Sequence, residues 1–252
     1  MTSPAQHGIR LERTGPVATV TLCRPEVLNA QTPQMWGRLR EIGAQLPGDV
    51  RVVVLRGEGR AFSAGIDLGV AQSEFATLSA ADPQAAADQI AEYQAGFTWL
   101  RRPDFISIAA VQGHAIGAGF QLALSCDLRV AADDARFTMA EVSLGLVPDL
   151  TATKRLVELV GYGRAVEICA TGRRVGAAEA QAIGLTNLVV PPDQLDAAVS
   201  DLTAALLAPA RDAVVEIKAL LLGATGRSAA EQEQAEREAQ VRRLRDLAGL
   251  GE

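Results

Sequence analysis

The sequence holds few of the residues on which metal and disulfide chemistry depend. It has two histidines, and its three cysteines, at positions 23, 126 and 169, match neither a metal-binding spacing nor a disulfide framework. We therefore expect the cysteines to be packing residues in a reducing compartment, the cytoplasm. Without a cluster of metal ligands, the chemistry of this chain must depend on carboxylates, amides and the backbone.

Basic charge and long hydrophobic runs are also scarce. The formal net charge is −6 and the pI is near 5.1, which argues against nucleic acid as a partner, because phosphate binding needs a clustered excess of Lys and Arg. A small anionic ligand needs only a few local cations or a helix N-terminus. No run of about 18 apolar residues could span a bilayer. The first twenty residues lack the apolar core and basic flank of a secretory signal.

The composition is otherwise that of a folded globular protein, with 48% hydrophobic and 21% charged residues. Residues 17–22 and 51–55 have the apolar pattern of strands. Between them the sequence predicts a helix with Thr32 as N-cap, Pro33 at its first position, and apolar residues at 35, 39, 42 and 46. The Val-Val-Val-Leu run at 52–55 is typical of a parallel strand buried on both faces. These patterns predict an α/β fold.

Further strands are predicted at residues 105–111, 128–132, 136–139 and 188–190. Residues 70–100 are rich in Ala, Gln and Asp, and we expect a mobile loop there that leads into a helix over residues 85–100. From residue 151 onward the pattern is mostly helical, with Gly161 and Gly184 as helix stops. Ser228 and Glu231 match a capping box at the start of a charged, solvent-facing helix.

Two glycine-rich turns follow two of the predicted strands and lead towards helices. They are AFSAGIDL at residues 61–68 and GHAIGAG at residues 113–119. Such turns present unpaired backbone N–H groups at the positive end of a helix dipole, and their small residues let a ligand oxygen approach. On successive strands of one sheet, the two turns could converge on a single oxygen. The alternative is that the glycines only allow close packing of helix on strand. The second turn lacks the Lys-Ser/Thr of an NTPase loop and the glycine spacing of a dinucleotide fingerprint.

In order, spacing and local structure, these motifs resemble the paired signatures of the crotonase (enoyl-CoA hydratase/isomerase) superfamily. The likeness covers most of the chain and includes RPEVLNA at residues 24–30 and CDLR at residues 126–129. It implies a crotonase-like spiral of β-β-α units over residues 1–195 and a C-terminal helical trimerisation region over residues 196–252. The expected assembly is a homotrimer or a homohexamer. The family's last helix, which completes the CoA site of a neighbouring subunit, is expected to be missing beyond Glu252.

The resemblance also implies a ligand and the residues that bind it. An acyl-CoA thioester would be the substrate, and no separate cofactor is expected. The N–H groups of Ile66 and Ala118 would stabilise the negative charge that develops on the thioester oxygen during proton removal or water addition. The CoA moiety would lie along Val27, Ala64, Ile66, Asp67, Leu68 and Ala118.

Hydratases of the superfamily use two glutamates, and this chain has one of them. The first position holds Gln121 and the second holds Glu141. Gln121 cannot exchange protons as a glutamate does, although its amide could orient a water. Glu141 alone could move a proton from C2 of a 3-enoyl thioester to C4, and an apolar cleft would raise its pKa towards the working pH. The resemblance to single-glutamate isomerases therefore favours Δ3–Δ2 enoyl-CoA isomerisation over hydration. The alternative for Glu141 is an ordinary surface or helix-capping carboxylate.

Asp149 is a second carboxylate that could take part in catalysis. Some relatives in the superfamily place a working aspartate at this point, so Asp149 could assist Glu141 or support other CoA chemistry. It could equally cap the helix that follows. A third hypothesis is a non-catalytic acyl-CoA binding protein, which Gln121 favours. His114, inside the second turn, is expected to be structural. Cations that could hold the CoA phosphates, each of which could equally be a solvated charge, are Arg24, Arg101, Arg102 and Lys218.

Overall fold

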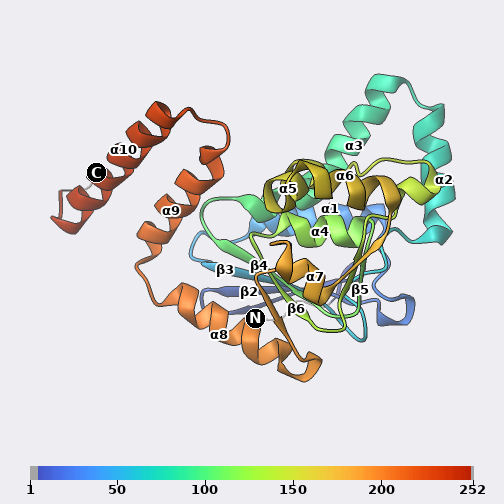
Figure 1. Ribbon diagram of the computed structural model, residues 1–252, viewed down its shortest axis with the longest axis horizontal. Helices are drawn as coiled ribbons and strands as arrows, with labels where there is room; N and C mark the ends of the chain where they lie inside the picture. Colours follow the sequence, from blue (N-terminus) through green and yellow to red (C-terminus); the bar gives the residue numbers. More distant parts are fainter. Residues whose placement is uncertain (1–4, 251–252) are drawn as a thin grey trace.

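The computed structural model describes residues 5–250, so the outermost residues of both predicted regions lie outside the described part. A six-stranded sheet forms its centre, with the order β1-β2-β3-β4-β6-β9 (Figure 1). Its strands are β1 Ile9–Thr14, β2 Val17–Leu22, β3 Val52–Gly57, β4 Ile106–Val111, β6 Leu128–Ala132 and β9 Leu188–Val190. Only β1 and β2 pair antiparallel; the other neighbours in this sheet are parallel. The predicted α/β fold with buried parallel strands is confirmed.

A smaller sheet stands beside the first and contains β5 His114–Ile116, β7 Arg136–Thr138 and β8 Arg174–Gly176. Strands β3 and β4 are neighbours in the central sheet and pair in parallel, with Val54 opposite Ile108. The two glycine-rich turns follow the carboxyl ends of these two strands, so the sheet delivers both turns to the same edge.

Helices cover both faces of the central sheet, and each face has its own apolar core (Figure 1). On one face lie α1 Pro33–Gln45, α3 Pro83–Thr98, α4 Ala118–Ser125, α5 Ala152–Val160 and α6 Tyr162–Thr171. Helix α7 Ala177–Ala182 packs against β8 and β9. Helix α1 begins as predicted, since the Thr32 hydroxyl accepts a hydrogen bond from the N–H of Met35 at 3.4 Å. Short 3-10 helices lie at Pro25–Val27, Trp99–Arg101, Glu141–Leu144 and Pro192–Gln194.

On the other face, α8 Leu195–Leu207 packs Leu195 and Val199 against Val52 and Ile108 of the sheet. The helical region after residue 195 is therefore anchored on the core from its first helix, while the boundary itself stays a prediction. Helices α9 Arg211–Ala224 and α10 Ala229–Leu247 then run side by side at one side of the molecule in Figure 1, where Lys218 of α9 is bonded to Phe105 and Asp127 of the core domain. The capping box predicted for the last helix is present.

The expectation for residues 70–100 is wrong in its first half. Helix α2 spans Leu68–Ala80, where we expected a mobile loop, and it begins with the Asp67 carboxylate accepting from the N–H of Gly69 at 3.0 Å. Helix α3 starts at Pro83, two residues earlier than predicted, with Asp82 as its N-cap. Strand β1 was also not predicted. Along residues 5–250, no helix combines the length and the apolar character needed to cross a membrane.

Candidate active site

The two glycine-rich turns are hydrogen-bonded directly to each other. The N–H of Ser63 donates to the carbonyl of His114 at 2.8 Å, and the N–H of Ile116 donates to the carbonyl of Ser63 at 3.0 Å. Gly65 has a φ of +89°, and a side chain at this position would place its Cβ 2.6 Å from the carbonyl oxygen of Ile116. The same Cβ would lie 3.6 Å from the backbone nitrogen of Ala118. The prediction that the turns meet is confirmed, and glycine is required for the contact.

The N–H groups of Ile66 and Ala118 have no hydrogen-bond partner within residues 5–250. Their neighbours are engaged: the N–H of Asp67 donates to the carbonyl of Gln31 at 2.8 Å, and the N–H of Gly117 donates to Thr138 at 2.8 Å. Ala118 is the first residue of α4, so its N–H lies at the positive end of that helix. Ile66 and Ala118 line the same cavity. The site therefore has two unpaired donors, one from each turn.

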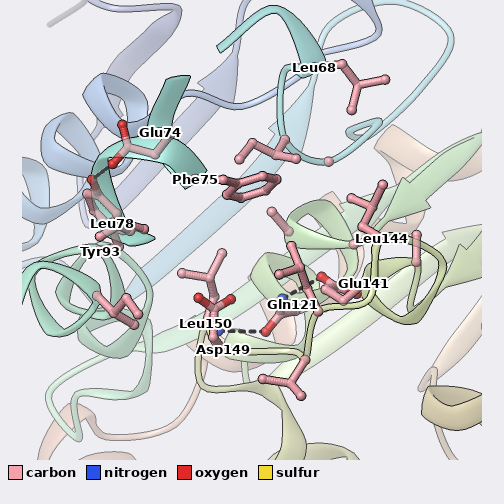
Figure 2. Close-up of a pocket in the computed structure, with 18 of the residues that line it drawn as sticks. Leu68, Glu74, Phe75, Leu78, Tyr93, Gln121, Glu141, Leu144, Asp149 and Leu150 are labelled. Carbon is pink, nitrogen blue, oxygen red and sulfur yellow. Dashed lines mark hydrogen bonds between the residues drawn. The ribbon is translucent and has the colours of Figure 1, made fainter. Parts of the chain in front are cut away.

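Glu141 lies against the second turn and is held by Gln121 (Figure 2). The Gln121 amide nitrogen donates to Oε1 of Glu141 at 2.7 Å, and its oxygen accepts from the N–H of Leu150 at 2.8 Å. Gln121 is fully buried, at 0% exposure. The other carboxylate oxygen of Glu141, Oε2, is buried and has no hydrogen-bond partner among the described residues. An unpaired buried oxygen of this kind is costly, and it suits a group that exchanges a proton with a ligand.

Burial raises the pKa of Glu141 above the ordinary value of a glutamate. The hydrogen bond from Gln121 acts in the opposite direction, because it stabilises the charged carboxylate, and the negative charge of Asp149 raises the pKa further. The expected direction of the shift is confirmed. A raised pKa makes Glu141 a better proton acceptor once it is ionised.

The cavity in front of these groups has a volume of about 730 Å³. Apart from the site residues, its wall is mainly apolar and comes from α2, α3 and the segment 140–150. Leu144, Leu146 and Val147 form the wall on the side of Glu141. No group of three or more potential metal ligands lies together among the described residues.

Comparison with known proteins places this architecture in one family. The sequence model of the enoyl-CoA hydratase/isomerase family matches residues 12–246. The chain belongs to this family. The enoyl-CoA hydratase/isomerase assignment agrees with the resemblance carried by the two turns and with the mixed α/β fold.

Individual members of the enoyl-CoA hydratase/isomerase family are also similar. A Thermobifida fusca protein, provisionally named an enoyl-CoA hydratase and solved in complex with acetoacetyl-CoA, is 50% identical; the alignment covers 95% of this chain and 96% of the other, with a TM-score of 0.92. A probable enoyl-CoA hydratase of Mycobacterium bovis is 35% identical over 74% of this chain and 70% of its own length. A Dictyostelium discoideum dienoyl-CoA isomerase is 31% identical over 73% of this chain and 65% of its own length.

The residues expected along CoA divide into two groups in this enoyl-CoA hydratase/isomerase. Ala64, Ile66, Leu68 and Ala118 line the cavity. Val27 and Asp67 do not line it. Asp67 instead accepts from the Arg24 guanidinium at 2.8 Å, and this bond lowers the pKa of its carboxyl.

The four candidate cations for the CoA phosphates all have partners within the protein. Arg24 is bonded to the carbonyl of Ala30 as well as to Asp67, and Arg101 pairs with Glu158 at 3.5 Å. Arg102 donates to Asp104 and to the carbonyl of Gly43. Lys218 is 5% exposed and is bonded to Asp127 and to the carbonyl of Phe105, both at 2.7 Å. Its charge is therefore buried rather than offered to a phosphate.

Asp149 faces the cavity, and it does not cap the following helix. The N-cap of α5 is Thr151, which makes no side-chain capping bond, so that alternative is wrong. The carboxylate of Asp149 is open to the cavity, and desolvation by the surrounding wall raises its pKa. His114 contributes its backbone carbonyl to the link between the turns, which agrees with a structural role.

The sequence places residues 70–100 along the acyl pocket, but it does not single out the residues that α2 and α3 contribute to the cavity. They are Leu68, Glu74, Phe75, Leu78, Ser79, Ala86, Ile90 and Tyr93, the first of which was expected only as a CoA contact. Helix α3 is tied to the opposite wall, because the Gln94 amide donates to the carbonyl of Asp149 at 2.6 Å. The Asp82-Pro83 pair, a common helix start, is the signal that could have located α3 and the helix before it.

Proposed function

We propose that this enzyme isomerises 3-enoyl-CoA thioesters to 2-enoyl-CoA with Glu141 as its single base. The Glu141 carboxylate takes a proton from C2 of the substrate, and the electron pair moves onto the thioester oxygen. The N–H groups of Ile66 and Ala118 stabilise that oxyanion. The proton returns to C4, so the double bond moves from C3–C4 to C2–C3 and no atom is gained or lost.

The arrangement of Gln121 is the observation that carries this proposal. Its amide oxygen is taken by the N–H of Leu150, and one amide hydrogen is given to Glu141. An amide neither takes up nor releases a proton near neutral pH, so Gln121 cannot activate a water molecule as the first glutamate of a hydratase does. Because Glu141 keeps an unpaired oxygen, proton transfer by one carboxylate is the chemistry that the site supports best.

Two catalytic contributions can be given an approximate size for this site. Two preorganised donors to the oxyanion contribute about 3 kcal/mol each. General base catalysis by Glu141 contributes a further factor of about 10² to 10⁴. An acyl-CoA thioester supplies the group that becomes the oxyanion, and we propose that no separate cofactor is needed. A cytoplasmic location stays a prediction.

Asp149 favours a second candidate, in which the same oxyanion site serves other CoA chemistry. Its carboxylate opens on the same cavity, and no side chain of the described residues donates a hydrogen bond to it. In this alternative Asp149 carries the proton, or acts as the nucleophile, while Glu141 is dispensable.

Turnover of 3-enoyl-CoA and of 2-enoyl-CoA by the wild type, Glu141→Gln and Asp149→Asn separates these candidates. Isomerisation that falls by about a hundredfold or more in Glu141→Gln, and changes little in Asp149→Asn, supports the proposal. Loss of activity only in Asp149→Asn supports the second candidate. Tight binding of CoA thioesters without turnover of either substrate indicates an acyl-CoA binding protein instead.

We also propose that the chain assembles into a homotrimer or a pair of trimers through α9 and α10. Both helices expose large apolar side chains, namely Ile217, Leu221, Leu222, Val241, Leu244 and Leu247. An exposed apolar surface of this kind is typical of an interface. Light scattering coupled to size-exclusion chromatography should give a trimer or hexamer for the wild type and a smaller species for Leu221→Glu. A monomeric wild type would refute the assembly.

A further inference from the structure

The cavity has a second polar group on the side away from Glu141, formed by Glu74 of α2 and Tyr93 of α3. Figure 2 shows this pair on one side of the cavity and the Gln121–Glu141 pair on the other, with Phe75 between them. Both Glu74 and Tyr93 line the cavity, together with apolar residues of the same two helices, including Leu78 and Ile90.

The hydrogen bonding of this pair leaves the Glu74 carboxylate as an acceptor. The Tyr93 hydroxyl donates to Oε1 of Glu74, and the Gln89 side chain also lies against that hydroxyl. The Tyr93 ring is held in place by Trp36, with ring centroids 5.0 Å apart. The orientation of the pair is therefore fixed from the α1–α3 side of the cavity.

Glu74 has no cationic partner within residues 5–250, and Tyr93 is its only hydrogen-bond donor there. An ionised carboxylate can accept about four hydrogen bonds, so most of its capacity is unused. Glu74 is only partly buried and lines the cavity, so its remaining lone pairs can be reached by a ligand there. The spare acceptor capacity suits a donor on the ligand.

We propose that Glu74 binds a hydroxyl group at the far end of the acyl chain, so that the preferred substrates are hydroxylated acyl-CoA thioesters. The inference rests on the proposed function for the CoA thioester class, but not on the reaction that follows binding. A neutral hydroxyl is favoured over an ammonium group because the neighbouring wall is apolar, and a full charge would lose its hydration there.

Calorimetric binding of saturated acyl-CoAs to the wild type tests the proposal without turnover. At each of several chain lengths, the ω-hydroxyacyl-CoA is compared with the methyl-ended and ω-amino analogues. At the length that reaches Glu74, the hydroxylated ligand should bind about tenfold more tightly than the methyl-ended one. Tighter or equal binding of the methyl-ended ligand at every length overturns the proposal, and tighter binding of the amino ligand overturns the choice of a hydroxyl.

Glu74→Leu should abolish or reverse the preference for the hydroxyl, and Glu74→Gln, which keeps the shape and an acceptor, should reduce it. Tyr93→Phe should retain it, because Glu74 remains. Glu92→Gln is the matched control, since Glu92 lies beside Tyr93 on α3 but pairs with Arg40 and does not line the cavity. A preference that survives in both Glu74 variants refutes the role of this residue.

The two proposals fail in different ways. A hydroxyl preference without isomerisation of any 3-enoyl-CoA removes the proposed reaction and leaves the binding inference intact. Isomerisation of a 3-enoyl-CoA without a hydroxyl preference removes the binding inference and leaves the proposed reaction intact.

Discussion

Gln121 donates a hydrogen bond to Oε1 of Glu141 at 2.7 Å, and this contact fixes which oxygen of Glu141 is free. The amide cannot rotate without loss, because its oxygen accepts from the N–H of Leu150 at 2.8 Å. Oε2 is left buried and unpaired. Gln121, which the resemblance places where hydratases have a glutamate, thus orients Glu141.

Gln121→Glu should shift the enzyme towards hydration of 2-enoyl-CoA. The new carboxylate can still accept from the N–H of Leu150, and its second oxygen would lie next to Glu141, so that one proton is shared between two acids. We expect the ratio of hydration to isomerisation to rise by about a hundredfold or more, because general acid–base catalysis by a second group is worth that factor. Rates measured with both substrates check this. An unchanged ratio would show that Gln121 does not decide the reaction.

Asp149→Asn should extend activity to lower pH. Isomerisation requires ionised Glu141, so kcat/KM falls as the pH drops through the pKa of Glu141. The charge of Asp149 raises that pKa. Removing the charge lowers it, and the acid limb of the profile moves to lower pH. The control is Asp193→Asn, at an exposed position in the 3-10 helix Pro192–Gln194. If the acid limb of the Asp149→Asn profile moves to higher pH or stays in place, the charge of Asp149 does not raise the pKa of Glu141.

The sequence was sufficient to predict that the two turns meet, because their meeting depends on local rules. Each turn follows a strand of a parallel sheet, neighbouring strands end at the same edge, and small residues permit contact. Gly65 and Ala118 therefore lie where the pattern places them. The apolar surroundings of Glu141 could likewise be predicted from its neighbours.

The contacts of Gln121 and the position of α2 could not be predicted in the same way. Leu150, which fixes the Gln121 amide, comes from a loop whose path depends on tertiary packing. Helix α2 buries only Ala71, because its larger apolar residues, Leu68, Phe75 and Leu78, line the cavity and do not pack in the core. Its start depends on the Asp67 cap, a residue that the resemblance places along CoA. Strand β1 follows a tight turn at Gly8 and could have been found from the alternation after it.

Gly65→Ala should weaken the site and the fold together. The added methyl would lie 2.6 Å from the carbonyl of Ile116, in a backbone conformation that side chains rarely adopt. We expect a loss of about 1–3 kcal/mol in the free energy of unfolding. Displacement of the Ile66 N–H by about 1 Å should reduce kcat by about a hundredfold.

Gly163→Ala is the matched control for this prediction, because nothing lies within 4 Å of its added Cβ and it is in helix α6. Chemical denaturation and steady-state kinetics of both variants give the two quantities. If Gly65→Ala retains wild-type stability and kcat, the close approach of the turns is not needed.

Lys218→Met should destabilise the protein, because it leaves the half-buried Asp127 carboxylate without its cation. Lys218 comes from α9 and also contacts the Phe105 ring, at 5.2 Å from its centroid. Breaking a buried pair on one side costs about 3–5 kcal/mol. Lys154, the only other lysine, has a side chain that is 74% exposed, and Lys154→Met should change stability by less than about 0.5 kcal/mol. Equal changes in the free energy of unfolding for Lys218→Met and Lys154→Met, measured in urea, would contradict the structural role of Lys218.

The position of the thioester oxygen relative to Ile66 and Ala118 tests the central claim most directly. A crystal structure of Glu141→Gln with a bound 3-enoyl-CoA would show it. The account predicts the carbonyl oxygen about 2.7–3.1 Å from both backbone nitrogens, with C2 facing the side chain at position 141. A carbonyl that contacts neither nitrogen, or a C2 that faces away from position 141, would contradict it.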